Sequence, residues 1–190
     1  MRLSSSHADR TSVLRRYAAR ARAAWAAHRA RIRLTAGGDC GPLLPHLETL
    51  NLEGCALKDA VPGAEAAGGG MPRVFAQLFP SLRNLELTYN DLTGAALVRE
   101  TLEQLLFASE VDADGARRAG LRRLCLCGNK IGEIEGLREL ALAVFRDGDG
   151  DERRKRWTLE ELDVRENSIA VLAGELGLLP LEIFLVDGNL

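Results

Sequence analysis

The chain has 190 residues, of which 46% are hydrophobic, enough for one domain with a core and too few for two comfortable ones. No apolar run approaches the roughly 18 residues that a membrane helix needs, and no signal-type apolar stretch follows the amino terminus. The net charge of −2 hides an asymmetry, because residues 1–36 carry nine arginines against one acid and the remainder is therefore acidic. The four cysteines, at 40, 55, 125 and 127, show neither the spacing of a secreted disulfide framework nor that of a paired zinc motif. Together these features favour a cytoplasmic protein with a basic head and an acidic body.

Residues 1–36 are predicted to form a basic, Arg- and Ala-rich amphipathic helix, separate from a domain at 37–190. Between residues 13 and 32 the larger apolar side chains, among them Leu14, Tyr17 and Trp25, fall within one stripe at about 100° per residue, with arginines opposite. Three roles stay open for this helix. They are capping of the following domain, mitochondrial targeting, and binding to an anionic membrane or a nucleic acid.

One phrase, L-x-x-L-x-L-x-x-(N/C)-x-L, then recurs along the chain. Full copies occupy residues 47–57, 82–92, 121–131 and 159–169, and an incomplete fifth copy begins at Leu181. A single copy would be weak evidence in a leucine-rich chain. Four copies that fit at every defined position predict a repeat architecture.

Each copy is predicted to form a short strand followed by a turn. Alternate side chains of a strand face opposite ways, so the second and third leucines of a copy point into the core. The asparagine of the phrase is expected to turn inward and to hydrogen-bond backbone groups of the turn. If the strands stack in order, the outward positions line up in rows across a parallel sheet.

Between the strands we expect helical returns and insertions. The apolar residues that each helix should bury are Val98, Leu102, Leu105 and Leu106 within 95–107, and Leu137, Leu140 and Leu142 within 134–145. Glycine-rich or charged insertions are predicted at 62–70, 109–120 and 147–156, the last of them flexible. The final repeat is shorter and should need less helix.

The phrase resembles the repeats of intracellular leucine-rich-repeat proteins, and the resemblance covers roughly residues 43 to 190. The ending E-L-G-L-L-P-L-E-I-F-L-V-D-G-N is similar to the last repeats of long cytosolic members that act as scaffolds in signalling. The resemblance implies an α/β solenoid with a curved parallel sheet, helices on the convex side and ligand binding on the concave side. Such members usually continue further, so we expect either a fragment of a longer protein or a last strand covered by a partner.

The outward positions of the strands are the predicted partner-binding residues. Acids outnumber arginines among them, so a partner with a basic or mixed segment is expected, with Tyr89 as an aromatic anchor. The convex side or the insertions remain an alternative surface. The predicted residues are Asn51, Glu53, Glu86, Thr88, Tyr89, Arg123, Cys125, Cys127, Glu161, Asp163, Arg165, Leu185 and Asp187.

Several motifs resemble parts of a metal-binding or catalytic site, but each lacks the remaining residues. Cys125 and Cys127 share one strand face, but two thiols do not close a zinc site, and we expect them to be ordinary exposed thiols. The sequence D-G-D-G-D at 147–151 lacks the later ligands of a calcium loop. No phosphate-binding glycine loop and no nucleophile with its base are recognisable. We therefore expect no enzyme activity, no cofactor, no metal and no small-molecule substrate.

Two functions follow from the sequence. The first is a cytoplasmic protein-interaction module or scaffold that binds its partner on the concave face of the repeats. The alternative is a protein whose basic N-terminal helix targets it to an organelle such as the mitochondrion or binds it to a polyanion. The identity of the partner and the oligomeric state do not follow from the sequence.

Overall fold

The computed structural model describes residues 44–59, 75, 78–109, 118–146 and 151–190. All of these belong to one compact unit, Pro42–Leu190. The predicted basic helix at 1–36 and the insertion at 62–70 lie outside the described residues. No helix in the described part of the chain is both long and apolar enough to span a membrane.

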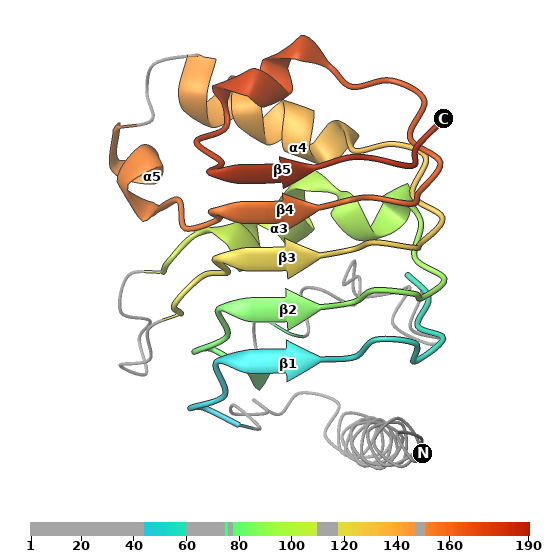
Figure 1. Cartoon of the computed structure of the whole chain (residues 1–190). Coiled ribbons are helices and arrows are strands. Elements are labelled where there is room, and N and C mark those ends of the chain that lie inside the picture. Colours follow the sequence, from blue (N-terminus) through green and yellow to red (C-terminus); the bar gives the residue numbers. More distant parts are fainter. Residues whose placement is uncertain (1–43, 60–74, 76–77, 110–117, 147–150) are drawn as a thin grey trace, which may run out of the picture. The chain divides into compact units, whose positions relative to one another are not determined.

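Five short strands form one parallel sheet in chain order, as the repeat predicts (Figure 1). The strands are β1 (Thr49–Asn51), β2 (Asn84–Glu86), β3 (Arg123–Cys125), β4 (Glu161–Asp163) and β5 (Ile183–Leu185). Equivalent positions of the phrase pair with one another throughout, for example Leu85 with Leu124 and Leu124 with Leu162. The predicted stacking order and register are therefore confirmed.

The leucines of the phrase form the core beneath the sheet. Leu85, Leu124 and Leu162 of the central strands are buried, and so are the apolar residues two positions further on. Because strand side chains alternate between faces, these residues point to the side that the helices cover. In the fifth copy the equivalent Phe184 and Val186 are only half-buried, since β5 pairs with β4 alone among the described strands.

The helical returns pack on one face of the sheet (Figure 1). They are the 3₁₀ turn η2 (Gly94–Leu97), α3 (Arg99–Leu106), α4 (Glu135–Leu140), the π turn η3 (Ala141–Arg146) and the 3₁₀ turn η4 (Gly174–Leu178). As predicted, α3 buries Leu102, Leu105 and Leu106, and the last repeat contains only a 3₁₀ turn. On the opposite face of the sheet, the described chain places no helix.

Two of the expected helix contacts are wrong. Val98 is exposed because it is the extended residue that precedes α3 and does not share the helical face. Leu142 is only half-buried, and Ala141 and Val144 are buried in its place. The π turn explains this second difference, since its wider winding shifts the phase of the side chains that follow α4.

The charged insertion at 147–156 was expected to be flexible, but its described part forms helix α5 (Asp151–Arg156), which leads into Trp157. Residues 147–150 lie outside the described residues. The indole ring packs edge-on against Phe107 and Phe145, with ring centroids 5.4 and 5.5 Å apart. Phe107 and Trp157 also form an antiparallel bridge. This aromatic anchor, which the repeat pattern does not predict, holds the end of the insertion against the repeats.

The asparagines of the phrase join each repeat to the one before it. The Asn129 amide donates to the carbonyls of Leu87 and Leu126, at 3.0 and 2.8 Å, and its oxygen accepts from Leu92 N–H at 3.1 Å. Asn90, Asn167 and Asn189 bond in the same pattern. The predicted inward turn of the asparagine is confirmed, and the structure adds that its bonds reach across repeats. The turns are therefore cross-linked by buried hydrogen bonds.

Candidate binding face

The candidate site is the face of the sheet opposite the helices, which we call the open face. It is defined by the outward positions of the five phrases, and the strand register aligns these positions in rows as predicted. From β1 to β5 the positions are Thr49, Asn51 and Glu53; Asn84, Glu86 and Thr88; Arg123, Cys125 and Cys127; Glu161, Asp163 and Arg165; and Ile183, Leu185 and Asp187. The strands thus place side chains from Thr49 to Asp187 on one face, with β1 and β5 at its opposite edges.

Three of the predicted contact residues are buried instead of exposed. Cys125 is 2%, Cys127 8% and Asp163 3% exposed. Cys125 lies between Glu86 of β2 and Asp163 of β4, and the Arg123 Nε lies 3.2 Å from its sulfur. A thiol is shorter than its charged neighbours, so these neighbours cover it. The expectation of ordinary exposed thiols is therefore wrong.

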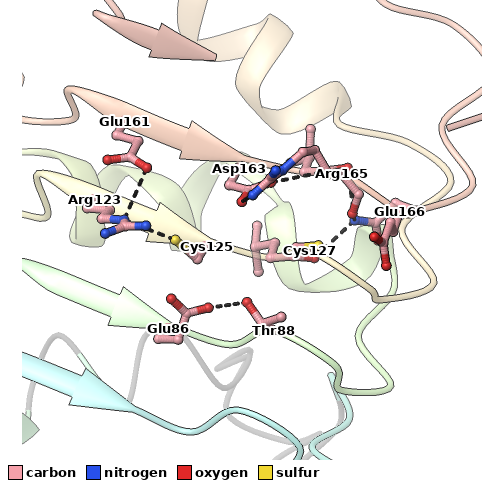
Figure 2. A network of polar contacts seen from close by, with 12 residues as sticks. Glu86, Thr88, Arg123, Cys125, Cys127, Glu161, Asp163, Arg165 and Glu166 are labelled. Carbon is pink, nitrogen blue, oxygen red and sulfur yellow. Dashed lines mark hydrogen bonds and ion pairs between the residues drawn. The ribbon is translucent and has the colours of Figure 1, made fainter. Parts of the chain in front are cut away.

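Both arginines of the open face are engaged by acids of the same face (Figure 2). Arg123 Nε lies 3.1 Å from the Glu161 carboxylate, and Arg165 donates to Asp163 at 2.7 and 3.0 Å. Burial alone would raise the pKa of Asp163, but hydrogen bonds from the Arg165 side chain and backbone hold that pKa below its usual value. Asp163 is thus an internal partner of Arg165, and reversing its charge would not be a clean test of surface binding.

The pairing leaves the open face with an excess of negative charge. Among the described residues, no ion pair involves Glu53, Glu86 or Asp187, and Glu86 accepts a hydrogen bond from the Thr88 hydroxyl. These carboxylates lie on β2 and on the turns after β1 and β5, around the paired centre. The acidic character predicted for this face therefore comes from its periphery.

A further row lies where the strands end, at the position just before the asparagine of the phrase. All five residues there adopt the left-handed conformation: Gly54, Tyr89, Gly128, Glu166 and Gly188. Glycine adopts it readily, whereas Tyr89 and Glu166 do so at some cost. The Tyr89 ring lies over Gly128, where a side chain would meet it at 2.3 Å, and its hydroxyl donates to Glu166 at 3.3 Å. Glycine at position 128 thus makes room for the tyrosine.

This row adds a neighbouring acid, Glu166, to the predicted anchor Tyr89. The side chain is 55% exposed, as an anchor should be, and the nearby Glu166 carboxylate raises the pKa of its hydroxyl. Glu166 was not among the predicted contact residues. Its position in the phrase, equivalent to that of Tyr89, was the signal that could have identified it. It adds one more acid to the rim of the open face.

The β5 end of the open face is apolar. Ile183 is 46% exposed, and Leu185 beside it is half-buried. Asp187 follows in the turn. In the described part of the chain, no group of three or more His, Cys, Asp or Glu side chains is placed to hold a metal ion. The D-G-D-G-D segment lies largely outside the described residues.

The buried thiols lead to a first prediction. Burial raises the pKa of Cys125 to about 11, with a further contribution from the Glu86 carboxylate, and burial also raises the pKa of Cys127. Only the thiolate reacts with iodoacetamide, so at pH 7.5 we expect alkylation of Cys125 roughly a hundredfold slower than in the unfolded chain, accelerating as the pH rises. Peptide mass spectrometry over time measures both rates. Equal rates for folded and unfolded chains would show that the thiol is open to solvent.

The fold and this face define an α/β protein in which stacked repeats build one parallel sheet. A family model described as Leucine Rich repeat matches residues 44–60, the segment that contains the first copy of the phrase and β1. The match supports a leucine-rich-repeat family for this chain, a family whose motifs are in general protein-interaction modules. No curated protein matches the chain.

Proposed function

We propose that the chain is an intracellular, scaffold-type protein-interaction module, a solenoid that binds a protein partner on the concave side of its sheet. The observation that carries the proposal is the open face itself. Five strands present their outward side chains in register on a side that no described helix covers. A surface of this kind suits an extended partner segment, because successive repeats offer equivalent positions along it.

The charges of the open face favour a partner with a basic segment. Arg123 and Arg165 are already paired within the face, so a partner's carboxylates find little to bind there (Figure 2). Glu53, Glu86 and Asp187 remain for lysine or arginine side chains. Such rim charges steer association and select partners more than they add affinity.

Affinity and register would come from the less polar positions. Tyr89 projects from the strand end with its ring supported by Gly128, and aromatic residues of this kind are frequent binding anchors. Ile183 and Leu185 extend the surface with apolar area at β5. In this proposal the domain acts by binding alone, in the cytoplasm, without catalysis.

Charge reversal on the open face tests the proposal. Immobilised wild-type chain should capture a specific partner from a cell lysate, identified by mass spectrometry, and Glu53→Lys combined with Glu86→Lys should weaken that binding by roughly tenfold. The matched control is Glu100→Lys combined with Glu139→Lys, two exposed acids on the helix side. Binding that survives the first pair and disappears with the second would place the partner on the helices and overturn the proposal.

A further inference from the structure

A small cationic cleft lies beside the sheet, where helix α5 meets the segments that lead into β3 and β4. Its volume is about 160 Å³, and its lining includes Glu103, Phe107, Ser109, Arg118, Arg153 and Arg156. None of these residues belongs to the open face. In Figure 1, α5 lies to the side of the sheet at the starts of the strands, away from the ends that carry Tyr89 and Glu166. The cleft is therefore distinct from the surface proposed for the protein partner.

Backbone hydrogen bonds fix the walls of this cleft. Ala108 N–H donates to the Arg156 carbonyl at 2.9 Å, and Ser109 N–H donates to the Arg118 carbonyl at 3.0 Å. The Arg118 N–H in turn donates to the Ser109 hydroxyl oxygen at 2.8 Å. The Phe107 ring against Trp157 supports the same corner of the fold. The backbone that carries Arg118 and Arg156 is therefore held in place by hydrogen bonds.

Among the described residues that line the cleft, basic side chains outnumber acidic ones. Three arginines line it, and Glu103 is the one acid that the structure describes in its lining. Glu103 is shared, because its carboxylate lies 3.1 Å from Arg99 Nε outside the cleft and 3.6 Å from Arg153. Glu103 is therefore divided between Arg99 and Arg153, and within the described residues no ion pair joins it to Arg118.

Two hydrogen-bond donors in the cleft are available to a ligand. Arg118 Nε is buried, and no described residue accepts a hydrogen bond from it. A buried charged donor without an acceptor is costly, and a bound ion or water is its usual partner. The Ser109 oxygen accepts from Arg118 N–H, which leaves its hydroxyl proton available to donate. Both donors belong to lining residues of the same cleft.

We propose that this cleft binds an oxyanion, a phosphoryl or carboxylate group, with Arg118, Arg153 and Ser109 as donors. Guanidinium groups bind such oxygens through strong charge-assisted hydrogen bonds. The small volume of the cleft, about 160 Å³, suits one such group. The site is a second recognition point, independent of the open face.

Anion titration of the ¹⁵N-labelled full chain tests the site. The arginine Nε–Hε signals are followed with sodium phosphate and separately with sodium acetate, each against sodium chloride at equal ionic strength. We expect a saturable shift of the Arg118 signal. Saturation with phosphate alone assigns a phosphoryl group as the natural ligand, and saturation with acetate assigns a carboxylate.

Substitutions make the test specific. Arg153→Gln should weaken anion binding about tenfold, because it removes one charge-assisted hydrogen bond. Arg118→Gln should weaken it by a similar factor, and for this variant binding is followed through the signals of the remaining arginines. Glu103→Gln should strengthen binding, because it removes the opposing charge. The matched control Arg122→Gln removes an exposed arginine that pairs with Glu160 outside the cleft, and it should leave binding unchanged.

Three results would overturn the proposal. The first is a shift that chloride reproduces or that does not saturate. The second is equal weakening by Arg122→Gln, which would show unspecific attraction. The third concerns the neighbouring acids in the sequence, Glu110, Asp112 and Asp114. Phosphate or acetate binding that appears only after Glu110 is changed to glutamine and both aspartates to asparagine would mean that the chain's own carboxylate occupies the cleft.

Discussion

Replacing Asn129 with alanine should destabilise the domain by roughly 3–5 kcal/mol, a large part of the 5–15 kcal/mol that a domain of this size has. The substitution removes the hydrogen bonds to the Leu87 and Leu126 carbonyls and leaves Leu92 N–H buried without its acceptor. Both carbonyls keep a second hydrogen bond, Leu87 from Asn90 and Leu126 from Asn167. The loss in the free energy of unfolding is therefore smaller than if the carbonyls were left without any partner. Urea denaturation followed by circular dichroism measures the change.

Asn84→Ala is the matched control for this prediction. The Asn84 amide makes one surface hydrogen bond, to the Thr49 hydroxyl at 3.1 Å. Its removal should change the free energy of unfolding by less than about 0.5 kcal/mol. Similar losses for Asn129→Ala and Asn84→Ala would show that the buried asparagines do not join the repeats.

Gly136→Ala should destabilise the domain by roughly 3 kcal/mol or more, against the usual gain from replacing a helical glycine with alanine. Gly136 lies in α4, where an added Cβ would meet the Leu97 carbonyl oxygen at 2.0 Å and Arg99 N at 2.7 Å. Both atoms are backbone, so relief requires a shift of α4 away from the preceding repeat. The melting temperature should fall by several degrees.

Gly177→Ala separates this steric effect from helix propensity. Gly177 lies in η4, and an added Cβ there meets nothing within 4 Å. We expect an unchanged or slightly increased melting temperature for this variant. If Gly136→Ala also left the melting temperature unchanged, the close approach of α4 to the preceding turn would be refuted.

The two proposed binding regions, the open face and the cleft beside α5, can be tested separately. The open face would bind along rows of equivalent positions, so its specificity is spread over several repeats. The cleft beside α5 is built from insertion residues that occur once, and it would bind a single charged group. A partner that uses both would lose affinity on charge reversal at Glu86 and, independently, on Arg153→Gln.

Most of the sheet was determined by the sequence alone. The spacing of the phrase is sufficient to assign the strands, the inward leucines, the parallel order and the rows of outward positions, because strand side chains alternate with a period of two residues. The inward asparagines followed from the same phrase. A local pattern repeated in register carries this information without knowledge of the neighbouring repeats.

Whether each outward side chain is exposed and whether it is already paired was decided only by the tertiary structure. Whether Cys125 is exposed depends on Glu86 and Arg123 beside it, and whether Arg165 can meet a partner depends on its bond to Asp163. The π turn after α4, the Trp157 anchor and the cationic cleft likewise lie in or beside segments that do not repeat. Side chains on adjacent strands compete for the same hydrogen bonds, and that competition is set in space, between residues some forty positions apart in the chain.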